Sequence, residues 1–224
     1  MTIKQYYTAE QYNERIGSGF RSKLFRQSHL LMEKYNFGTI DKILEIGGGS
    51  IPHINFIKHK FNSYYSLEVD CGAKIDLYIN KNYPKIIFNY YDGKNIKFNE
   101  GFFDRIIISH CLEHILEPEK FINEMLRVLK KGGVISIALP CDPGILWRIG
   151  RLLLKTNGRI KEKFFLQKNI EASDYINATE HVNSIFNLYA ILKEKFNIEE
   201  EIFYPFNVKV IDLNLFYICQ IKKL

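Results

Sequence analysis

The segment that decides the fold is Ile43-Leu44-Glu45-Ile46-Gly47-Gly48-Gly49-Ser50, an apolar run that contains one acid and leads into three glycines. It predicts a buried strand that passes directly into a tight turn. A dinucleotide site uses G-x-G-x-x-G, with the pyrophosphate on a helix N-terminus. Here Pro52 stands where the third glycine is needed. The carboxylate of Glu45 near the turn repels a pyrophosphate and favours a cationic ligand instead.

A second acidic group follows about 20 residues after the glycines, at the spacing typical of a ribose-binding carboxylate. The run Tyr64–Val69 predicts a strand, and its end carries Glu68 and Asp70. A carboxylate there can accept hydrogen bonds from both ribose hydroxyls. Because residues two apart on a strand point the same way, geometry alone leaves both acids as candidates.

Two further signatures follow in order along the chain. Phe103–His114 fits the pattern F-D-x-I-x-x-x-H-x-L-E-H, and Arg127–Gly133 fits R-V-L-K-x-G-G. Together with the glycine turn and the acid of the second strand, they cover roughly Lys42 to Pro140. On these four signatures the chain resembles the class I S-adenosylmethionine-dependent methyltransferases of the broad small-molecule type. Ile51 departs from the pattern, because many members of that family carry a glycine there.

The alternation of strands and helices predicts an α/β fold. The resemblance implies a three-layer, Rossmann-like sandwich with a mostly parallel seven-stranded sheet and an antiparallel C-terminal hairpin. We expect one domain over 1–224, with an N-terminal helical cap over 1–40 and a variable acceptor or lid insert over 141–182. Strands are predicted at 43–46, 64–69, 86–88, 105–109, 134–139, 201–204 and 215–221, and helices at 9–33, from Pro118 to a C-cap at Gly132-Gly133, and at 183–196.

The resemblance implies that S-adenosylmethionine is the cofactor and assigns residues to it. Gly47, Gly48 and Gly49 would bring the backbone against its methionine moiety and adenosine. Glu45 would face the ammonium group, directly or through water, or would hold the amides of the turn. The family pattern favours Glu68 for the ribose. Asp92 would accept from the adenine amino group, or would only stabilise its own turn with the following glycine.

Three histidines and one acid complete the candidate site. The resemblance implies that His110 lines the cofactor pocket and that Glu113 and His114 are mainly architectural. We expect His181 or His110 to be the catalytic proton acceptor, because a free imidazole titrates near neutral pH. No metal site is expected, since the segment His110-x-x-Glu113-His114 does not offer a convincing third ligand.

The segment 144–168 carries all of the formal net charge of +6, with seven basic residues and one acid. Its apolar residues, among them Trp147, predict a basic amphipathic helix. Such a helix lies on an anionic membrane surface or an anionic ligand, or packs as a lid with solvated charges. The sequence leaves these alternatives open.

Composition narrows the remaining choices. No segment reaches the roughly 18 apolar residues of a membrane-spanning helix, no secretory signal is apparent, and four scattered cysteines suit a reducing cytoplasm. Nucleic acid is an improbable partner, because no motif for exocyclic amines is present. We expect methyl transfer to a small-molecule or glycan-like acceptor, such as a sugar hydroxyl or amine in surface-polysaccharide biosynthesis. The alternative is a non-catalytic binding protein that keeps the fold. The oligomeric state is left open.

Overall fold

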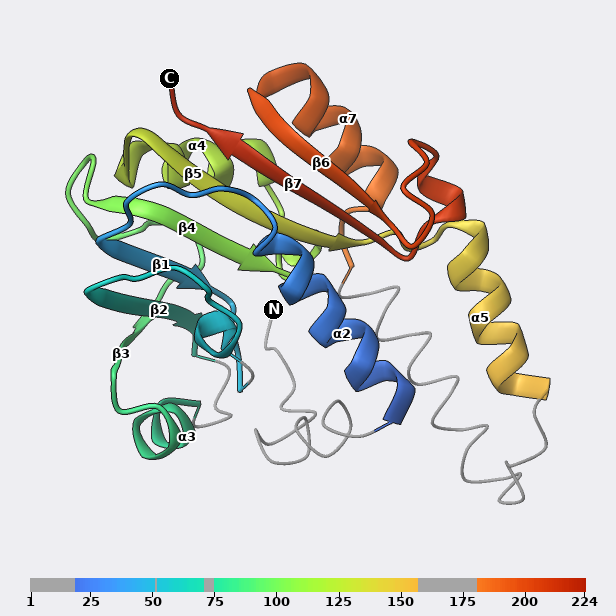
Figure 1. Ribbon diagram of the computed structural model, residues 1–224, viewed down its shortest axis with the longest axis horizontal. Coiled ribbons are helices and arrows are strands. Elements are labelled where there is room, and N and C mark those ends of the chain that lie inside the picture. Colours follow the sequence, from blue (N-terminus) through green and yellow to red (C-terminus); the bar gives the residue numbers. More distant parts are fainter. Residues whose placement is uncertain (1–18, 51, 71–74, 157–180) are drawn as a thin grey trace.

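The computed structural model describes residues 19–50, 52–70, 75–156 and 181–224. One seven-stranded sheet runs through the molecule in the order β3-β2-β1-β4-β5-β7-β6 (Figure 1). The strands are β1 (Lys42–Ile46), β2 (Ser63–Val69), β3 (Ile86–Tyr91), β4 (Phe103–Ser109), β5 (Leu129–Pro140), β6 (Ile198–Tyr204) and β7 (Phe216–Lys222).

Strands β1 to β5 pair in parallel, and β7 enters antiparallel between β5 and β6. This arrangement confirms the predicted α/β class and the antiparallel C-terminal pair. The parallel strands are buried on both faces, which is why they read as continuous apolar runs rather than as alternating ones. All seven predicted strands are present. However, β3 ends three residues later than predicted, and β5 begins five residues earlier than predicted.

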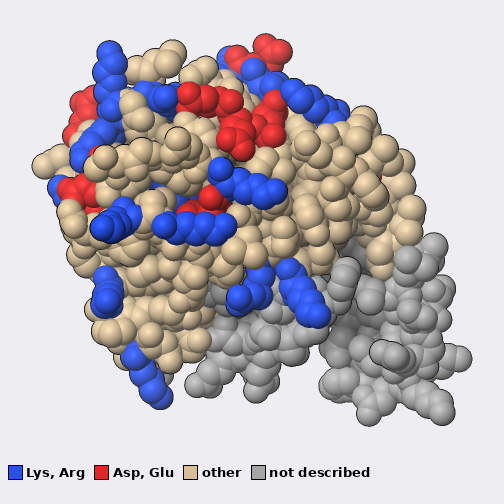
Figure 2. Space-filling view, in the orientation of Figure 1, with Lys and Arg blue, Asp and Glu red and all other residues tan. Residues whose placement is uncertain are grey.

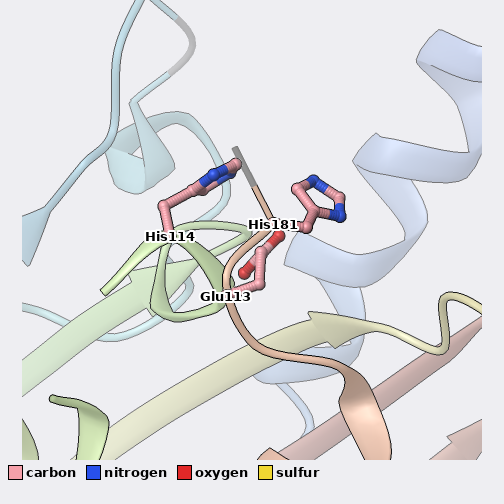
Figure 3. A group of neighbouring side chains, drawn as sticks. All are labelled: Glu113, His114 and His181. Atoms are coloured by element: carbon pink, nitrogen blue, oxygen red, sulfur yellow. The ribbon is translucent and has the colours of Figure 1, made fainter. Parts of the chain in front are cut away.

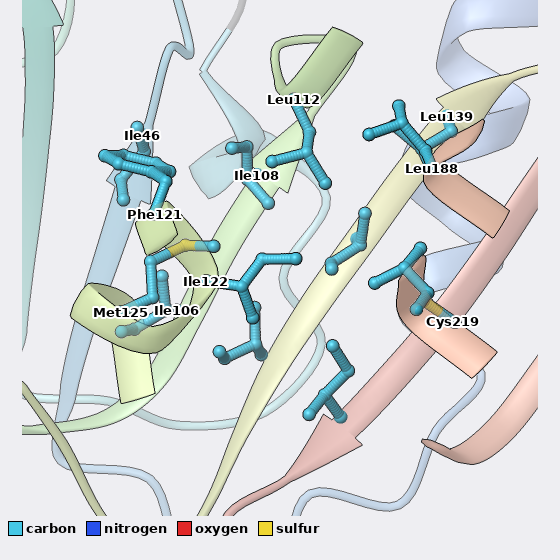
Figure 4. Packing of buried hydrophobic residues seen from close by; sticks show 14 of the residues in the cluster. Ile46, Ile106, Ile108, Leu112, Phe121, Ile122, Met125, Leu139, Leu188 and Cys219 are labelled. Atoms are coloured by element: carbon cyan, nitrogen blue, oxygen red, sulfur yellow. The ribbon is translucent and has the colours of Figure 1, made fainter. Parts of the chain in front are cut away.

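Helices cover both faces of the sheet. The α-helices are α2 (Gly19–Met32), α3 (Ile75–Asn82), α4 (Pro118–Val128), α5 (Ile145–Thr156) and α7 (Ile185–Lys195). Ile106 and Ile108 pack in the core beneath α4 and α7 (Figure 4), whereas Ile107 packs with α2 on the opposite face. This division follows from the two-residue period of a strand. No helix among the described residues has the length and apolarity needed to cross a membrane.

The predicted C-cap at Gly132-Gly133 is wrong. Helix α4 ends at Val128, and both glycines lie within β5. Gly132 has a φ of +77°, and a Cβ on Gly133 would lie 2.9 Å from the carbonyl oxygen of Asp104. The glycines therefore serve an irregular start of β5, where its pairing with β4 shifts register, and not the end of the helix.

The predictions near the N-terminus and after β5 are met in part. Of the predicted helices over 9–33, the described part is α2, and the helix predicted at 183–196 appears as α7 with Ser184 as its N-cap. Residues 1–18 and 157–180 lie outside the described residues. The cap over 1–40 and the insert over 141–182 therefore stay predictions.

A buried polar network joins α2 and the residues after it to the sheet. Arg105 in β4 is fully buried, forms an ion pair with Glu33, and donates from Nε to Ser136 at 3.0 Å. Glu33 also accepts from His53 Nε2 at 2.9 Å. Burial opposes ionisation of Glu33, but the hydrogen bond from His53 and the charge of Arg105 prevail and lower its pKa to about 2.

Candidate functional site

The glycine turn leaves β1 at the carboxyl edge of the sheet, where open α/β sheets bind ligands. Gly47 has a φ of +71° and donates from its amide to Leu67 O at 3.0 Å. A Cβ on Gly47 would lie 2.5 Å from Cys111 Sγ, so only glycine fits. Gly49 has a φ of +56°, and a Cβ there would meet no atom of the described residues within 4 Å. The side of the turn at Gly49 is therefore not covered by any of the residues that the structure describes.

Glu45 lies beneath this turn, with only 1% of its surface exposed. Its carboxylate accepts from the amide of His53 at 2.9 Å and from the hydroxyl of Tyr64 at 2.7 Å. Burial raises its pKa to about 7, although both hydrogen bonds favour the charged form. A Cβ on Gly48 would lie 2.5 Å from Glu45 Cδ. Among the described residues, the backbone amide that donates to Glu45 is therefore that of His53. Contact of Glu45 with a cofactor ammonium group stays a prediction.

The two acids at the end of β2 have different surroundings. Glu68 is half-buried and accepts from the amide of Gly49, whereas Asp70 is exposed. Burial raises the pKa of Glu68 to about 7, and the hydrogen bond from Gly49 opposes that rise. The structure therefore brings Glu68 into contact with the glycine turn. The assignment of Glu68 to a ribose stays a prediction that this contact supports.

Asp92 follows β3 and is exposed. Its carboxylate accepts from the amides of Lys94 and Asn95, at 2.8 and 2.7 Å, and from the side-chain amide of Asn95. These hydrogen bonds lower its pKa to about 2. Asp92 therefore stabilises its own turn, which is the alternative role expected from the sequence. Contact of Asp92 with adenine stays a prediction.

His110 lies at the end of β4 with a φ of +52°, a conformation that few residues other than glycine adopt. Its Nε2 lies 2.9 Å from Ser28 Oγ of α2, and its ring packs edge-on against Phe25 and Phe216. Burial, followed by the nearby His114 and His181, lowers its pKa to about 3. His110 is therefore neutral at physiological pH. The contact with Ser28 was missed from the sequence, because nothing in a single chain indicates which helix residue reaches β4.

His181 comes from the segment before α7 and lies beside the short 3₁₀ helix η2 (Leu112–His114). The ring centroids of His114 and His181 are 4.8 Å apart, and His181 Nδ1 lies 3.9 Å from Asp142 Oδ2. Figure 3 shows the Glu113 carboxylate pointing between the two imidazoles. The structure thus groups His181 with η2 at the edge that carries His110, which no spacing in the sequence could indicate.

Helix α5 follows β5, as predicted. The indole of Trp147 donates to Leu215 O at 2.8 Å and packs on Phe216, whereas Ile145 and Ile149 are 49% and 46% exposed. The side chains of residues 151–156 and the whole of 157–168 lie outside the described residues, including Arg151 and Lys155. On the face in Figure 2, basic side chains are spread over several elements.

Comparisons with known proteins agree with this geometry. Residues 44–137 match a family model described as a methyltransferase domain. The chain is 40% identical over 53 residues to ajmaline N-methyltransferase from Rauvolfia serpentina, covering 24% of this chain and 18% of that protein. It is 42% identical over 66 residues to demethylmenaquinone methyltransferase from Paenarthrobacter aurescens, covering 29% and 26%. The chain thus spans about a fifth to a quarter of the length of these relatives.

A solved structure resembles nearly the whole chain. A S-adenosylmethionine-dependent methyltransferase from Aquifex aeolicus superposes with a TM-score of 0.60 and 14% identity, covering 96% of this chain and 98% of that one. At this identity the likeness concerns the fold, and the family model independently matches residues 44–137, less than half of the chain. Residues 44–137 therefore resemble a methyltransferase domain, and the chain has the fold of the class I S-adenosylmethionine-dependent methyltransferases.

Proposed function

We propose that this protein transfers a methyl group from S-adenosylmethionine to a small-molecule acceptor. The contact between Glu68 and Gly49 is the observation that carries the proposal. The carboxylate that we assign to the ribose accepts from the amide of Gly49, and a Cβ on Gly49 would meet no atom of the described residues within 4 Å. No phosphate-binding pattern accompanies it, which suits a cationic cofactor better than a dinucleotide.

The reaction is an in-line displacement at carbon. A nucleophilic atom of the acceptor forms a bond to the methyl carbon while the bond from that carbon to the sulfonium breaks, and S-adenosylhomocysteine leaves. A hydroxyl or amine acceptor must also lose a proton. The protein contributes mainly by holding both reactants in line and by providing an acceptor for that proton.

Of the two histidines proposed as proton acceptors, His181 is the better placed. The Nε2 atom of His110 is engaged by Ser28, and its low pKa makes that imidazole a weak base. His181 is only partly buried and lies beside the Asp142 carboxylate. We therefore assign proton removal to His181 and the lining of the cofactor pocket to His110.

The finer acceptor assignment extends the proposal to a glycan-like molecule, such as a sugar hydroxyl or amine in surface-polysaccharide biosynthesis. It rests on the resemblance of Glu180-His181-Val182-Asn183 to a Glu-His-x-Asn segment of methyltransferases from such pathways. We extend it also to a cytoplasmic location, which the scattered cysteines suit. Charge alone extends it to contact of 144–168 with an anionic substrate or membrane surface. The relatives are named for ajmaline and demethylmenaquinone, both small organic molecules.

Calorimetry followed by methyl transfer tests the proposal. S-adenosylhomocysteine should bind with one site per chain, and NAD should not bind measurably. Cofactor labelled at its methyl group, incubated with pools of sugars, quinones and amines, should then give a labelled product by mass spectrometry. Tight NAD binding would refute the assignment of S-adenosylmethionine as the cofactor. Cofactor binding without turnover on any pool would favour the non-catalytic alternative.

A further inference from the structure

Three side chains with metal-binding atoms meet at the edge of the sheet that carries the glycine turn. They are Glu113 and His114 of η2 and His181 of the segment before α7 (Figure 3). One carboxylate oxygen and one ring nitrogen from each histidine all lie within 4.8 Å of one another. Metal bonds of about 2.0–2.2 Å require these atoms to come closer still when an ion binds.

The backbone holds the two segments together. The amide of Asn183 donates to the carbonyl of Glu113 at 3.1 Å, and the Asn183 side chain donates to Ile115 O at 2.6 Å. The Ile185 amide donates to Asp142 O at 3.2 Å. His181 is thus fixed against η2 from two residues away, by a buried asparagine. The grouping of the three side chains is built into the fold, which is what a binding site requires.

Glu113 provides a separate indication of a ligand. Its side chain is only 4% exposed, and its Oε2 atom is buried without a hydrogen-bond partner among the described residues. An unsatisfied buried carboxylate oxygen is costly. Figure 3 shows this carboxylate pointing between the two imidazoles. A cation bound there would satisfy the oxygen and complete its coordination with two nitrogens.

We propose that Glu113, His114 and His181 form a binding site for a divalent transition-metal ion. Two imidazoles and one carboxylate are a donor set that suits Zn²⁺ and its neighbours better than Mg²⁺ or Ca²⁺, which prefer oxygen. The Asp142 carboxylate beside His181 corresponds to the outer-shell carboxylate that commonly orients a metal-bound imidazole. No metal site was expected from the sequence, because the third ligand comes from a distant segment.

The site also has a consequence for the acceptor, and this part rests on the proposed function. Three protein ligands leave a coordination position open for an oxygen of the acceptor. His114 is exposed, so the cluster reaches the surface of the described residues. A bound ion would hold a hydroxyl of the acceptor and lower its pKa. Proton removal would then need a weaker base than a free hydroxyl requires, and His181 would act as a ligand instead of as the base.

Metal binding is tested directly with Co²⁺ and Zn²⁺ on chelator-treated full-length protein. We expect one Co²⁺ per chain by visible absorption and displacement of that ion by Zn²⁺ in calorimetry. Glu113→Gln, His114→Ala and His181→Ala should each weaken binding by at least 10- to 100-fold, the loss seen when even outer-shell partners are removed. Glu117→Gln, four residues after Glu113, and His59→Ala are the matched controls and should bind as wild type.

The readouts separate folding, metal binding and catalysis. Thermal melting and binding of S-adenosylhomocysteine report whether each variant is folded. No saturable Co²⁺ site in the wild type, or wild-type affinity in both Glu113→Gln and His181→Ala, would overturn the proposal and leave a cluster held by hydrogen bonds. If the ion binds but its removal leaves methyl transfer unchanged, the role in acceptor activation is wrong. Absence of methyl transfer to any acceptor would refute the proposed function. The conclusion on metal binding would still be decided by the Co²⁺ titration.

Discussion

The carboxylate of Glu68 accepts a hydrogen bond from the backbone amide of Gly49, which joins the end of β2 to the turn that follows β1. This contact fixes the spacing between the glycine turn and Glu68. Asp70, two residues further, is exposed and lies before residues 71–74, which are outside the described part.

Replacing Glu68 by Ala should weaken cofactor binding by about 1.5–3 kcal/mol, or roughly 10- to 150-fold, as expected for hydrogen bonds to a charged group. Asp70→Ala is the matched control and should change the affinity little. Calorimetry with S-adenosylhomocysteine measures both. The assignment of the ribose is wrong if the two variants rank in the opposite order.

Gly49→Ala should abolish most cofactor binding while the protein remains folded. The new Cβ enters the open space beside the turn, and the positive φ costs about 1–2 kcal/mol. Gly132→Ala is the control, because it has a similar φ and open surroundings but lies at the start of β5. We expect equal losses of melting temperature and unequal losses of affinity. Gly47→Val is a poorer test, since its side chain would also collide with Cys111.

Glu45→Gln should change the pH dependence of stability. The pKa of Glu45 is raised to about 7 in the fold, so between about pH 4.5 and 7 the folded state binds more protons than the unfolded state. The contribution of Glu45 to stability is therefore lost as pH rises through this window. Relative to wild type, the Gln variant should gain on the order of 3 kcal/mol, as an upper bound, from pH 4.5 to 7.

Urea denaturation of the free protein at a series of pH values measures this gain. Glu33→Gln is the control, because the pKa of Glu33 is lowered to about 2 and its stabilising charge is lost only as pH falls below about 4.5. Its difference from wild type should stay flat from pH 4.5 to 7. An equally flat difference for Glu45→Gln would show that its carboxylate is not perturbed.

Replacing His181 by Gln should lower turnover by roughly 100-fold or more and leave cofactor affinity intact, whether the imidazole removes a proton or binds an ion. His110→Gln should instead weaken cofactor binding, because we assign that ring, which packs against Phe25 and Phe216, to the lining of the cofactor pocket. Steady-state kinetics and calorimetry separate the two. Normal turnover in both variants would place the base elsewhere.

Changing Arg148, Arg151 and Lys155 to Glu tests the basic segment. The fold and cofactor affinity should not change, while the Michaelis constant of an anionic acceptor should rise or the protein should leave anionic vesicles. Each cation near such a surface contributes about 1 kcal/mol of attraction, weakened by salt. Wild-type activity and vesicle binding at low salt would identify these charges as merely solvated.

Much of the fold could be predicted from the sequence because its signals are local. The apolar runs of β1, β4 and β5 and the acid of Glu68 are each visible within a few residues. Gly132 and Gly133 led to a wrong prediction of a helix C-cap, since a glycine pair after a helical run is equally suited to a cap and to a strand irregularity. The pairing of Leu129 with Phe103 of β4 decides between them.

The parts of the site that escaped prediction are contacts between distant segments. Ser28 reaches His110, and His181 reaches Glu113, through elements whose relative placement is set by packing on the sheet. Asp92 shows the reverse difficulty, because an acid after a strand is compatible with both a ligand contact and its own turn. Only the geometry of the Asp92 loop reveals which hydrogen bonds it already makes.

The ion pair between Arg105 and Glu33 implies that the segment matching the family model, residues 44–137, is not an autonomous folding unit. A fragment beginning at residue 44 would keep the guanidinium of Arg105 in the core but lack Glu33. Breaking a buried pair in this way costs about 3–5 kcal/mol, a large share of the stability of a small domain. Domain boundaries placed at the ends of the family match would therefore separate residues that pack together in one core.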